Sequence, residues 1–117
     1  MHPMIDVTVI RNKSDKIQSF VISGHAFFAK RGKDIVCAGV SAVSVGAINA
    51  VHALTGVTPL IEQKDDGFLS CEIPGNLPED TMEKIQLLLE GMVVSLRTIE
   101  EEYGQHIKIT FKKQEVE

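Results

Sequence analysis

The chain has 117 residues, of which 44% are hydrophobic, and its formal net charge at pH 7 is −4. This length predicts a single domain, residues 1–117, with enough apolar material for one core. The acidic balance excludes a protein whose main task is to coat nucleic acid, so we expect no direct nucleic-acid partner.

The first segment predicts a β-hairpin. Apolar and other residues alternate from Ile5 to Val9, which is the period of a strand. A Lys-Ser-Asp turn follows at residues 13–15. Residues 17–24 then predict a second strand, with Phe20 and Ile22 on its apolar face.

A long helix is predicted over residues 35–54, ending near Gly56. Asp34 precedes it and fits an N-cap, because its carboxylate can accept hydrogen bonds from the unpaired amides of the first turn. The helix is rich in small residues and can approach its neighbours closely. Its larger apolar residues recur at spacings of three and four: Val36, Val40, Val43, Ala47, Val51 and Leu54.

The second half predicts another hairpin, another helix and a last strand. Residues 58–63 and 68–73 flank an Asp-Gly turn, which is a strong hairpin signal. Pro78 and two acidic residues predict a helix start, and Gly104 its end. The helical period is carried by Met82, Ile85, Leu89, Met92, Leu96, Ile99 and Tyr103.

Residues 107–111 alternate again and complete the order β-β-α-β-β-α-β. This order predicts an α+β fold, in which a single antiparallel or mixed sheet has its apolar face covered by two helices.

A thiol stands in the first turn of the first predicted helix. Cys37 comes three residues after Asp34, where the unpaired amides favour a thiolate. His25, at the end of a predicted strand, could take the thiol proton and return it to a leaving amine. The pattern suggests a cysteine nucleophile with a histidine base. A small buried cysteine is the other interpretation, and spacing alone leaves both open.

Two neighbouring residues also have more than one interpretation. Ser41 lies one helical turn after Cys37 and could hold the thiolate or orient a water, or could simply allow close packing. Asp34 could orient His25 as the third member of a triad, or only cap the helix. Cys71 lies within a predicted strand and is expected in the core. The His and Cys spacings match no zinc pattern, so we expect no metal or other cofactor.

The segment before the helix is basic around two aromatic residues. We expect the loop over residues 27–33 to be mobile and to order over a bound peptide. Its aromatic rings could grip an aromatic side chain of that peptide, or anchor the loop in the core. The expected substrate loop contains Phe27, Phe28, Lys30, Arg31, Gly32 and Lys33.

No uninterrupted apolar run approaches the roughly 18–20 residues of a membrane span, so no membrane partner is expected. The first six residues lack the layout of a secretory signal. We therefore expect a cytoplasmic protein in which both cysteines stay reduced.

Three motifs together resemble the ribosomal-processing cysteine protease family (Prp): Gly24-His25-Ala26, Asp34-Ile35-Val36-Cys37-Ala38 and Val40-Ser41. The resemblance extends over nearly the whole chain, including its length and order of elements. It implies a catalytic dyad of His25 and Cys37, with Gly24, Asp34 and Ser41 in support.

The resemblance also implies a partner, a precursor of large-subunit ribosomal protein twenty-seven. Family members remove a short N-terminal extension from it and cut after an aromatic residue. They are homodimers with a mobile loop over the site. The small-residue helix and the long apolar seam of the second helix also favour a homodimer, because one thin sheet covers little apolar surface.

Two other functions remain open from the residues alone. One is a non-enzymatic ribosome-associated assembly or binding module in which Cys37 only packs. The other is a redox protein that uses Cys37 as a sensor thiol, which the lack of a nearby resolving cysteine argues against.

Overall fold

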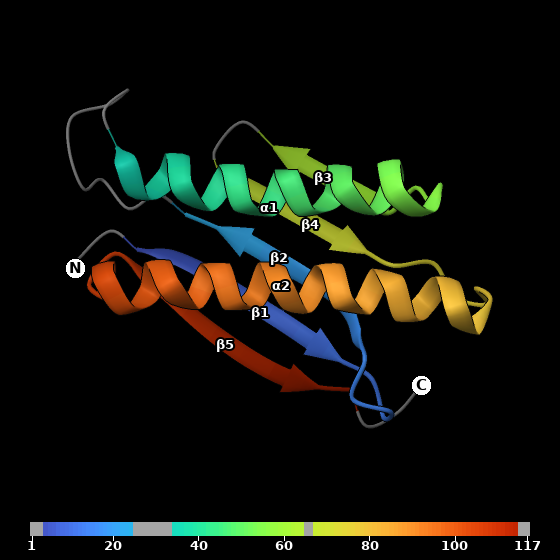
Figure 1. Cartoon of the computed structure of the whole chain (residues 1–117). Helices are drawn as coiled ribbons and strands as arrows, with labels where there is room; N and C mark the ends of the chain where they lie inside the picture. Colours follow the sequence, from blue (N-terminus) through green and yellow to red (C-terminus); the bar gives the residue numbers. More distant parts are fainter. Residues whose placement is uncertain (1–3, 25–33, 65–66, 115–117) are drawn as a thin grey trace.

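The computed structural model describes residues 4–24, 34–64 and 67–114, and in these ranges a five-stranded sheet carries two helices on one face (Figure 1). The order β-β-α-β-β-α-β expected from the sequence is confirmed. The elements are β1 Ile5–Arg11, β2 Ile17–Ser23, α1 Ile35–Thr55, β3 Leu60–Lys64, β4 Phe68–Glu72, α2 Glu79–Tyr103 and β5 Ile107–Lys113.

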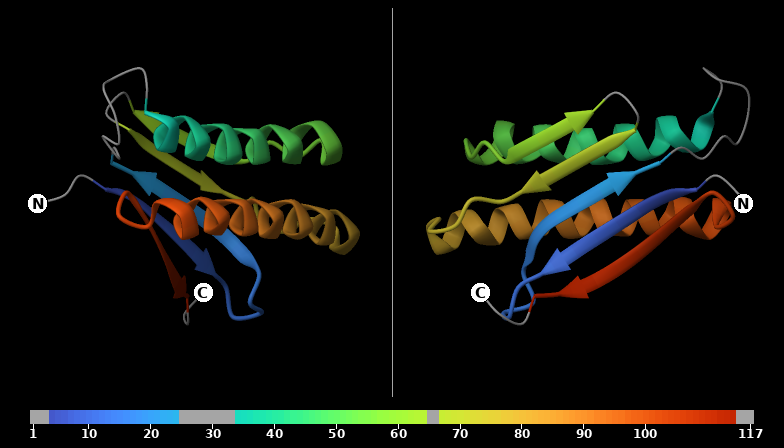
Figure 2. Two further views of the ribbon diagram at one scale, coloured as in Figure 1. Left: turned by 60° about the vertical axis from the view of Figure 1, so that its left-hand side comes forward. Right: turned by 180° about the vertical axis from the view of Figure 1, so that it is seen from behind.

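The sheet is mixed, with the strand order β3-β4-β2-β1-β5. Neighbouring strands are antiparallel except for β1 and β5, which run parallel with Ile5 opposite Ile107. Two parallel strands need a long crossover connection between them. The chain between β1 and β5 ends with α2, which lies on the helical side of the sheet and leads into β5. Figure 2 shows from two further directions that both helices lie on the same side.

The core lies between the sheet and the helices. The pairing register places Phe20 of β2 between Val9 of β1 and Cys71 of β4, and all three are almost fully buried. From α2, Ile85 and Leu89 face them and are also fully buried. Each such aliphatic or aromatic side chain contributes about 1.5–3 kcal/mol when it leaves water.

Helix α1 begins and ends as the sequence predicts. The Asp34 carboxylate accepts hydrogen bonds from the amides of Val36 and Cys37, both at 3.1 Å. At the other end Gly56 has φ 79°, in the left-handed region, and its amide donates to the His52 carbonyl. This is the geometry in which glycine replaces a side-chain-bearing residue at a helix end.

The predicted apolar stripe of α1 is wrong at its end, since Leu54 is 70% exposed. Ser44 belongs to the buried stripe instead, along with Val36, Val40 and Val51. A serine can be buried there because its hydroxyl donates to the Val40 carbonyl at 2.7 Å.

Helix α1 is also long and apolar enough, by length and composition alone, to cross a membrane. Its mean hydropathy reaches 1.7 over an 18-residue window, although only 22% of that window is buried in the fold. The helix contains no unbroken apolar run of this length because Ser, Gly and Asn interrupt it, but it carries no Asp, Glu, Lys or Arg. Core helices of soluble proteins pass the same test.

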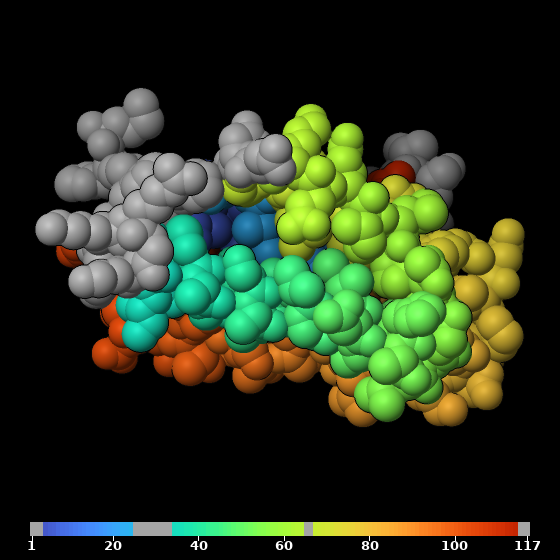
Figure 3. Space-filling view, turned by 90° about the horizontal axis from the view of Figure 1, so that it is seen from above, coloured from blue at the N-terminus to red at the C-terminus, as the bar shows by residue number. Residues whose placement is uncertain are grey.

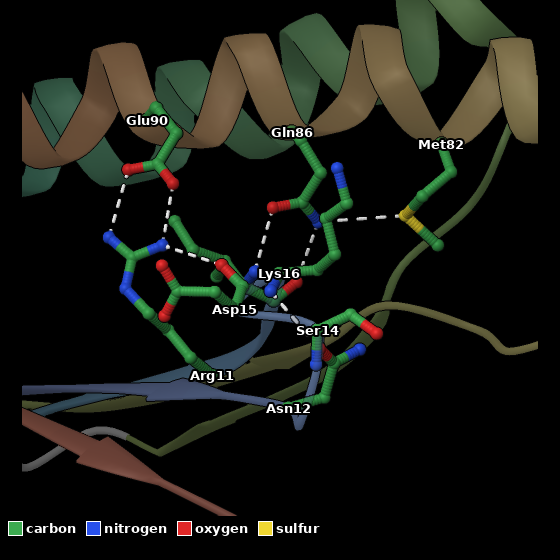
Figure 4. A network of polar contacts seen from close by, with 9 residues as sticks. Arg11, Asn12, Ser14, Asp15, Lys16, Met82, Gln86 and Glu90 are labelled. Carbon is green, nitrogen blue, oxygen red and sulfur yellow. Dashed lines mark hydrogen bonds and ion pairs between the residues drawn. The ribbon is translucent and has the colours of Figure 1, made fainter.

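A polar clamp fastens α2 to the β1–β2 turn (Figure 4). The Gln86 amide group accepts from the Ile17 N–H at 2.7 Å and donates to the Ile17 carbonyl at 2.8 Å. One turn later Glu90 forms two hydrogen bonds with the Arg11 guanidinium, at 2.6 and 3.0 Å. The hydrogen bond from Arg11 holds the pKa of the Glu90 carboxyl below its ordinary value.

Candidate active site

A groove of about 500 Å³ lies between the first half of α1 and the β3–β4 hairpin. Figure 3 shows α1 and the hairpin as its two walls, with the blue strands visible at its floor. Ile5 and Ile22 form part of that floor. One wall carries Cys37 and Ser41, and the residues of the other wall are Gln63, Lys64, Gly67, Phe68 and Leu69. This volume lies within the range of about 300–1,000 Å³ that is typical of ligand sites.

Cys37 enters the groove from the first turn of α1 and is partly buried. Its own backbone amide donates to the Asp34 carboxylate, so the cap fixes the turn that carries the thiol. The predicted N-cap role of Asp34 is confirmed by this geometry. Its second predicted role, orienting His25, stays a prediction because His25 lies outside the described residues.

Ser41 is exposed and lines the groove one turn beyond Cys37. The residue that α1 uses for close packing is Ser44, which is 1% exposed. Packing therefore does not account for Ser41. The position is consistent with a hydroxyl that meets substrate or water.

Gly24 has a backbone reason to be glycine. Its φ is 97°, a conformation that residues with a side chain rarely adopt, and a Cβ at this position would collide with the Met4 carbonyl oxygen. Only glycine allows the end of β2 to pass this close to Met4, the residue before β1.

We expect Gly24→Ala to lower the free energy of unfolding by about 1–3 kcal/mol, because the strained φ and the backbone collision act together. Urea denaturation measures the loss, and peptidase activity should fall with it. Gly91→Ala is the matched control: a Cβ at Gly91 meets nothing within 4 Å, so alanine should raise helix stability by about 0.5–1 kcal/mol. Equal stability changes in the two variants would contradict this explanation of Gly24.

The rest of the predicted site falls outside the described residues. This applies to His25 and to the expected substrate loop of Phe27, Phe28, Lys30, Arg31, Gly32 and Lys33. The His25–Cys37 contact and the ordering of the loop stay predictions.

The hairpin wall of the groove was not predicted from the sequence. Its polar residue Gln63 occupies a position on β3 that faces the helical layer, two residues after Ile61. The signal that could have marked this wall was Gln63, a polar side chain at an inward-facing position of the strand. Which strand would lie beside Cys37 could not be read from the sequence, because β4 pairs with β2, which is distant in sequence.

The two cysteines have different surroundings, and both are thiols rather than halves of a disulfide. Cys71 is 2% exposed and packs in the core, as predicted. Burial raises the pKa of its thiol to about 11. Cys37 instead lines the groove.

We expect iodoacetamide at pH 7 to modify Cys37 at least about tenfold faster than Cys71, because the thiolate is the reactive species and burial blocks the reagent. With its pKa near 11, only about one Cys71 thiol in ten thousand is ionised at pH 7. Peptide mapping by mass spectrometry gives both rates. In urea the two rates should become similar, and Cys71 reacting first in the folded protein would contradict the assignment.

The comparisons with known proteins agree with this geometry. Residues 4–108 match the family described as "Cysteine protease Prp". The "Ribosomal processing cysteine protease Prp" of Bacillus subtilis (strain 168) is 46% identical over 108 residues, which are 92% of this chain and 96% of the relative.

Two similar crystal structures are of the essential ribosomal processing protease Prp from S. aureus. One, with a covalently linked product peptide, has a TM-score of 0.84 and 38% identity. The other, with a substrate peptide, has a TM-score of 0.78 and 37% identity. Each covers 93% of this chain and the whole of the other.

The family match and these relatives, which share the fold, define the class of this protein as a cysteine peptidase. The chain belongs to the Prp family of cysteine proteases, as the sequence motifs suggested.

Proposed function

We propose that this peptidase removes the N-terminal extension of large-subunit ribosomal protein twenty-seven during ribosome maturation, with Cys37 as nucleophile and His25 as general base. The observation that carries the proposal is the position of Cys37, at the capped start of α1 and in the wall of the groove. The names of the relatives, which describe ribosomal processing proteases, support the substrate class.

The proposed reaction has two steps. The Cys37 thiolate attacks the carbonyl carbon of the scissile bond, and His25 gives the proton it took from the thiol to the leaving amine. A thioester with the N-terminal fragment results. Water, deprotonated by His25, then attacks the thioester, which releases the carboxylate and restores the thiol.

Helix α1 assists this chemistry by its direction. The positive end of the helix dipole at its start favours negative charge on the Cys37 sulfur. Asp34 satisfies the amides of Val36 and Cys37 and so keeps the turn in place. We assign to the Ser41 hydroxyl the placement of substrate or water beside the sulfur, and to Asp34 the support of this turn.

The experiment is cleavage of a synthetic peptide with an aromatic residue before the cut site, followed by mass spectrometry. We expect two products, cut after the aromatic residue, and we expect a peptide with aspartate in that place to remain intact. Cleavage of both peptides at the same rate would overturn the specificity. A folded protein that cleaves neither would favour the non-enzymatic binding module.

We further propose that the protein is cytoplasmic and acts as a homodimer. Helix α1 carries no Asp, Glu, Lys or Arg, and the exposed residues Leu87 and Val94 add apolar surface on α2. Exposed apolar surface of this kind favours association. Light scattering at micromolar concentration should give twice the 12.9 kDa mass of the chain. A mass of one chain at that concentration would contradict the dimer.

A further inference from the structure

The two edges of the sheet differ in how they are covered. At one edge, the outward amide of Ile109 in β5 donates to the Glu100 carboxylate of α2 at 2.8 Å. At the other edge lies β3, whose five residues are all exposed. Within the described ranges no strand pairs with the outer side of β3. An edge left open in this way can accept another extended chain.

The pairing pattern shows which groups of β3 point outwards. Ile73 donates its amide to the Gln18 carbonyl, so this position of the chain faces β2. The backbone N–H and C=O groups of successive residues in a strand point alternately to its two sides. Ser70, three residues before Ile73, therefore directs its backbone groups to β3, where its partner is Glu62. The backbone groups of Ile61 and Gln63, between the bonded positions, therefore point away from the sheet.

Proline supports this assignment. Pro59 directly precedes β3 and lies two residues before Ile61 and four before Gln63. Its backbone nitrogen is therefore on the same outward side of the strand. Proline has no amide to donate and is tolerated on the outer side of an edge strand. The open edge thus offers two backbone amides, those of Ile61 and Gln63.

The open edge is continuous with the groove that holds the thiol. Gln63 and Lys64 line this groove opposite Cys37 and Ser41. The side chains of Ile61 and Gln63 are on the helical side of the sheet, because Ile61 pairs with buried Cys71. In Figure 3 the hollow opens between α1 and the β3 side of the sheet.

We propose that the peptide substrate binds as an added strand along β3, with its main chain paired to Ile61 and Gln63, and that it continues past Lys64 to Cys37. Main-chain pairing holds any extended peptide without regard to its sequence, while alternate side chains enter the groove beside α1. This inference rests on the proposed function, since it takes the bound chain to be the substrate.

Gln63→Pro and Gln63→Ala form the matched pair that tests the proposal. Proline removes the outward amide, whereas alanine removes the side chain and keeps the amide. Both are introduced into Cys37→Ala protein, so that binding of the intact aromatic-site peptide is measured by calorimetry without cleavage. We expect proline to raise Kd about tenfold and alanine less than about threefold, because one hydrogen bond is lost only with proline.

A second measurement does not depend on how the variants fold. Peptides N-methylated at one residue at a time are bound to the Cys37→Ala protein. Binding should weaken at every second residue of the segment along β3, since only alternate amides of an added strand face its neighbour. A uniform or absent effect of methylation would overturn the proposal.

The other outcomes separate the two claims. Equal Kd values for the proline and alanine variants overturn strand addition, and leave the proposed function standing if the Cys37 protein cleaves the peptide. A third outcome is that Gln63→Pro halves the mass measured by light scattering and leaves the Kd for the peptide unchanged. That result would show that β3 pairs with a second copy of the chain, and it would also overturn strand addition of the substrate. Failure of the Cys37 protein to cleave any aromatic-site peptide is instead a failure of the proposed function.

Discussion

Replacing Cys37 with alanine is expected to lower kcat/KM for peptide cleavage by at least about a thousandfold, since a covalent mechanism has no substitute for its nucleophile. Cys37→Ser should be almost as inactive, because a hydroxyl needs stronger base activation than a thiol. Cys37 is only partly buried, so the alanine variant should unfold in urea within about 1 kcal/mol of the original. Steady-state kinetics and urea denaturation together separate chemistry from folding.

The matched control is Cys71→Ala, the same change at the other thiol. Cys71 packs in the core, so alanine there should reduce stability by about 1–2 kcal/mol and leave cleavage at 25 °C nearly unchanged. His25→Ala should resemble Cys37→Ala, because nucleophile and base act as one unit. Activity that survives in Cys37→Ala would contradict the proposed mechanism outright.

Replacing Gln86 with leucine is expected to lower the free energy of unfolding by about 2–5 kcal/mol. Gln86 is 7% exposed and is bonded to both the amide and the carbonyl of Ile17. Leucine has a similar size but can neither accept nor donate, so two buried backbone groups would lose their partners. Each such group left unsatisfied costs about 1–3 kcal/mol.

Urea denaturation of Gln86→Leu and Gln105→Leu provides the comparison. Gln105 is exposed, so leucine there should change stability by less than about 0.5 kcal/mol. Gln86→Glu should be intermediate at neutral pH, because a carboxylate can accept from the Ile17 amide but cannot donate to its carbonyl. A loss below 1 kcal/mol in Gln86→Leu would show that the clamp is not needed to hold α2.

The elements could be predicted because their signals are local. Asp34 and Gly56 bound α1 where the sequence placed them, since a cap and a left-handed glycine act within one turn. The expected strand over residues 58–63 instead begins at Leu60, directly after Pro59.

The pairing of the strands could not be predicted, because it depends on contacts between distant segments. Nothing near Ile5 in sequence indicates that it lies beside Ile107, or that the neighbour of β2 is β4. The groove arises from that second pairing, which brings Gln63 opposite Cys37. The thiol and its cap were thus predictable from sequence, whereas the opposite wall of the groove was not.

The interior strand β1 lies between β2, which follows it directly in the chain, and β5, which is the last strand of the chain. During synthesis the N-terminal hairpin can form early, but β1 keeps one side uncovered until β5 has left the ribosomal tunnel. Such distant pairing slows folding, because a long loop must close before the contact stabilises anything. We therefore expect the nascent chain to gain resistance to proteases late, once residues 107–113 are free. The peptidase would acquire its finished sheet, and with it a stable groove, only after most of its own translation is complete.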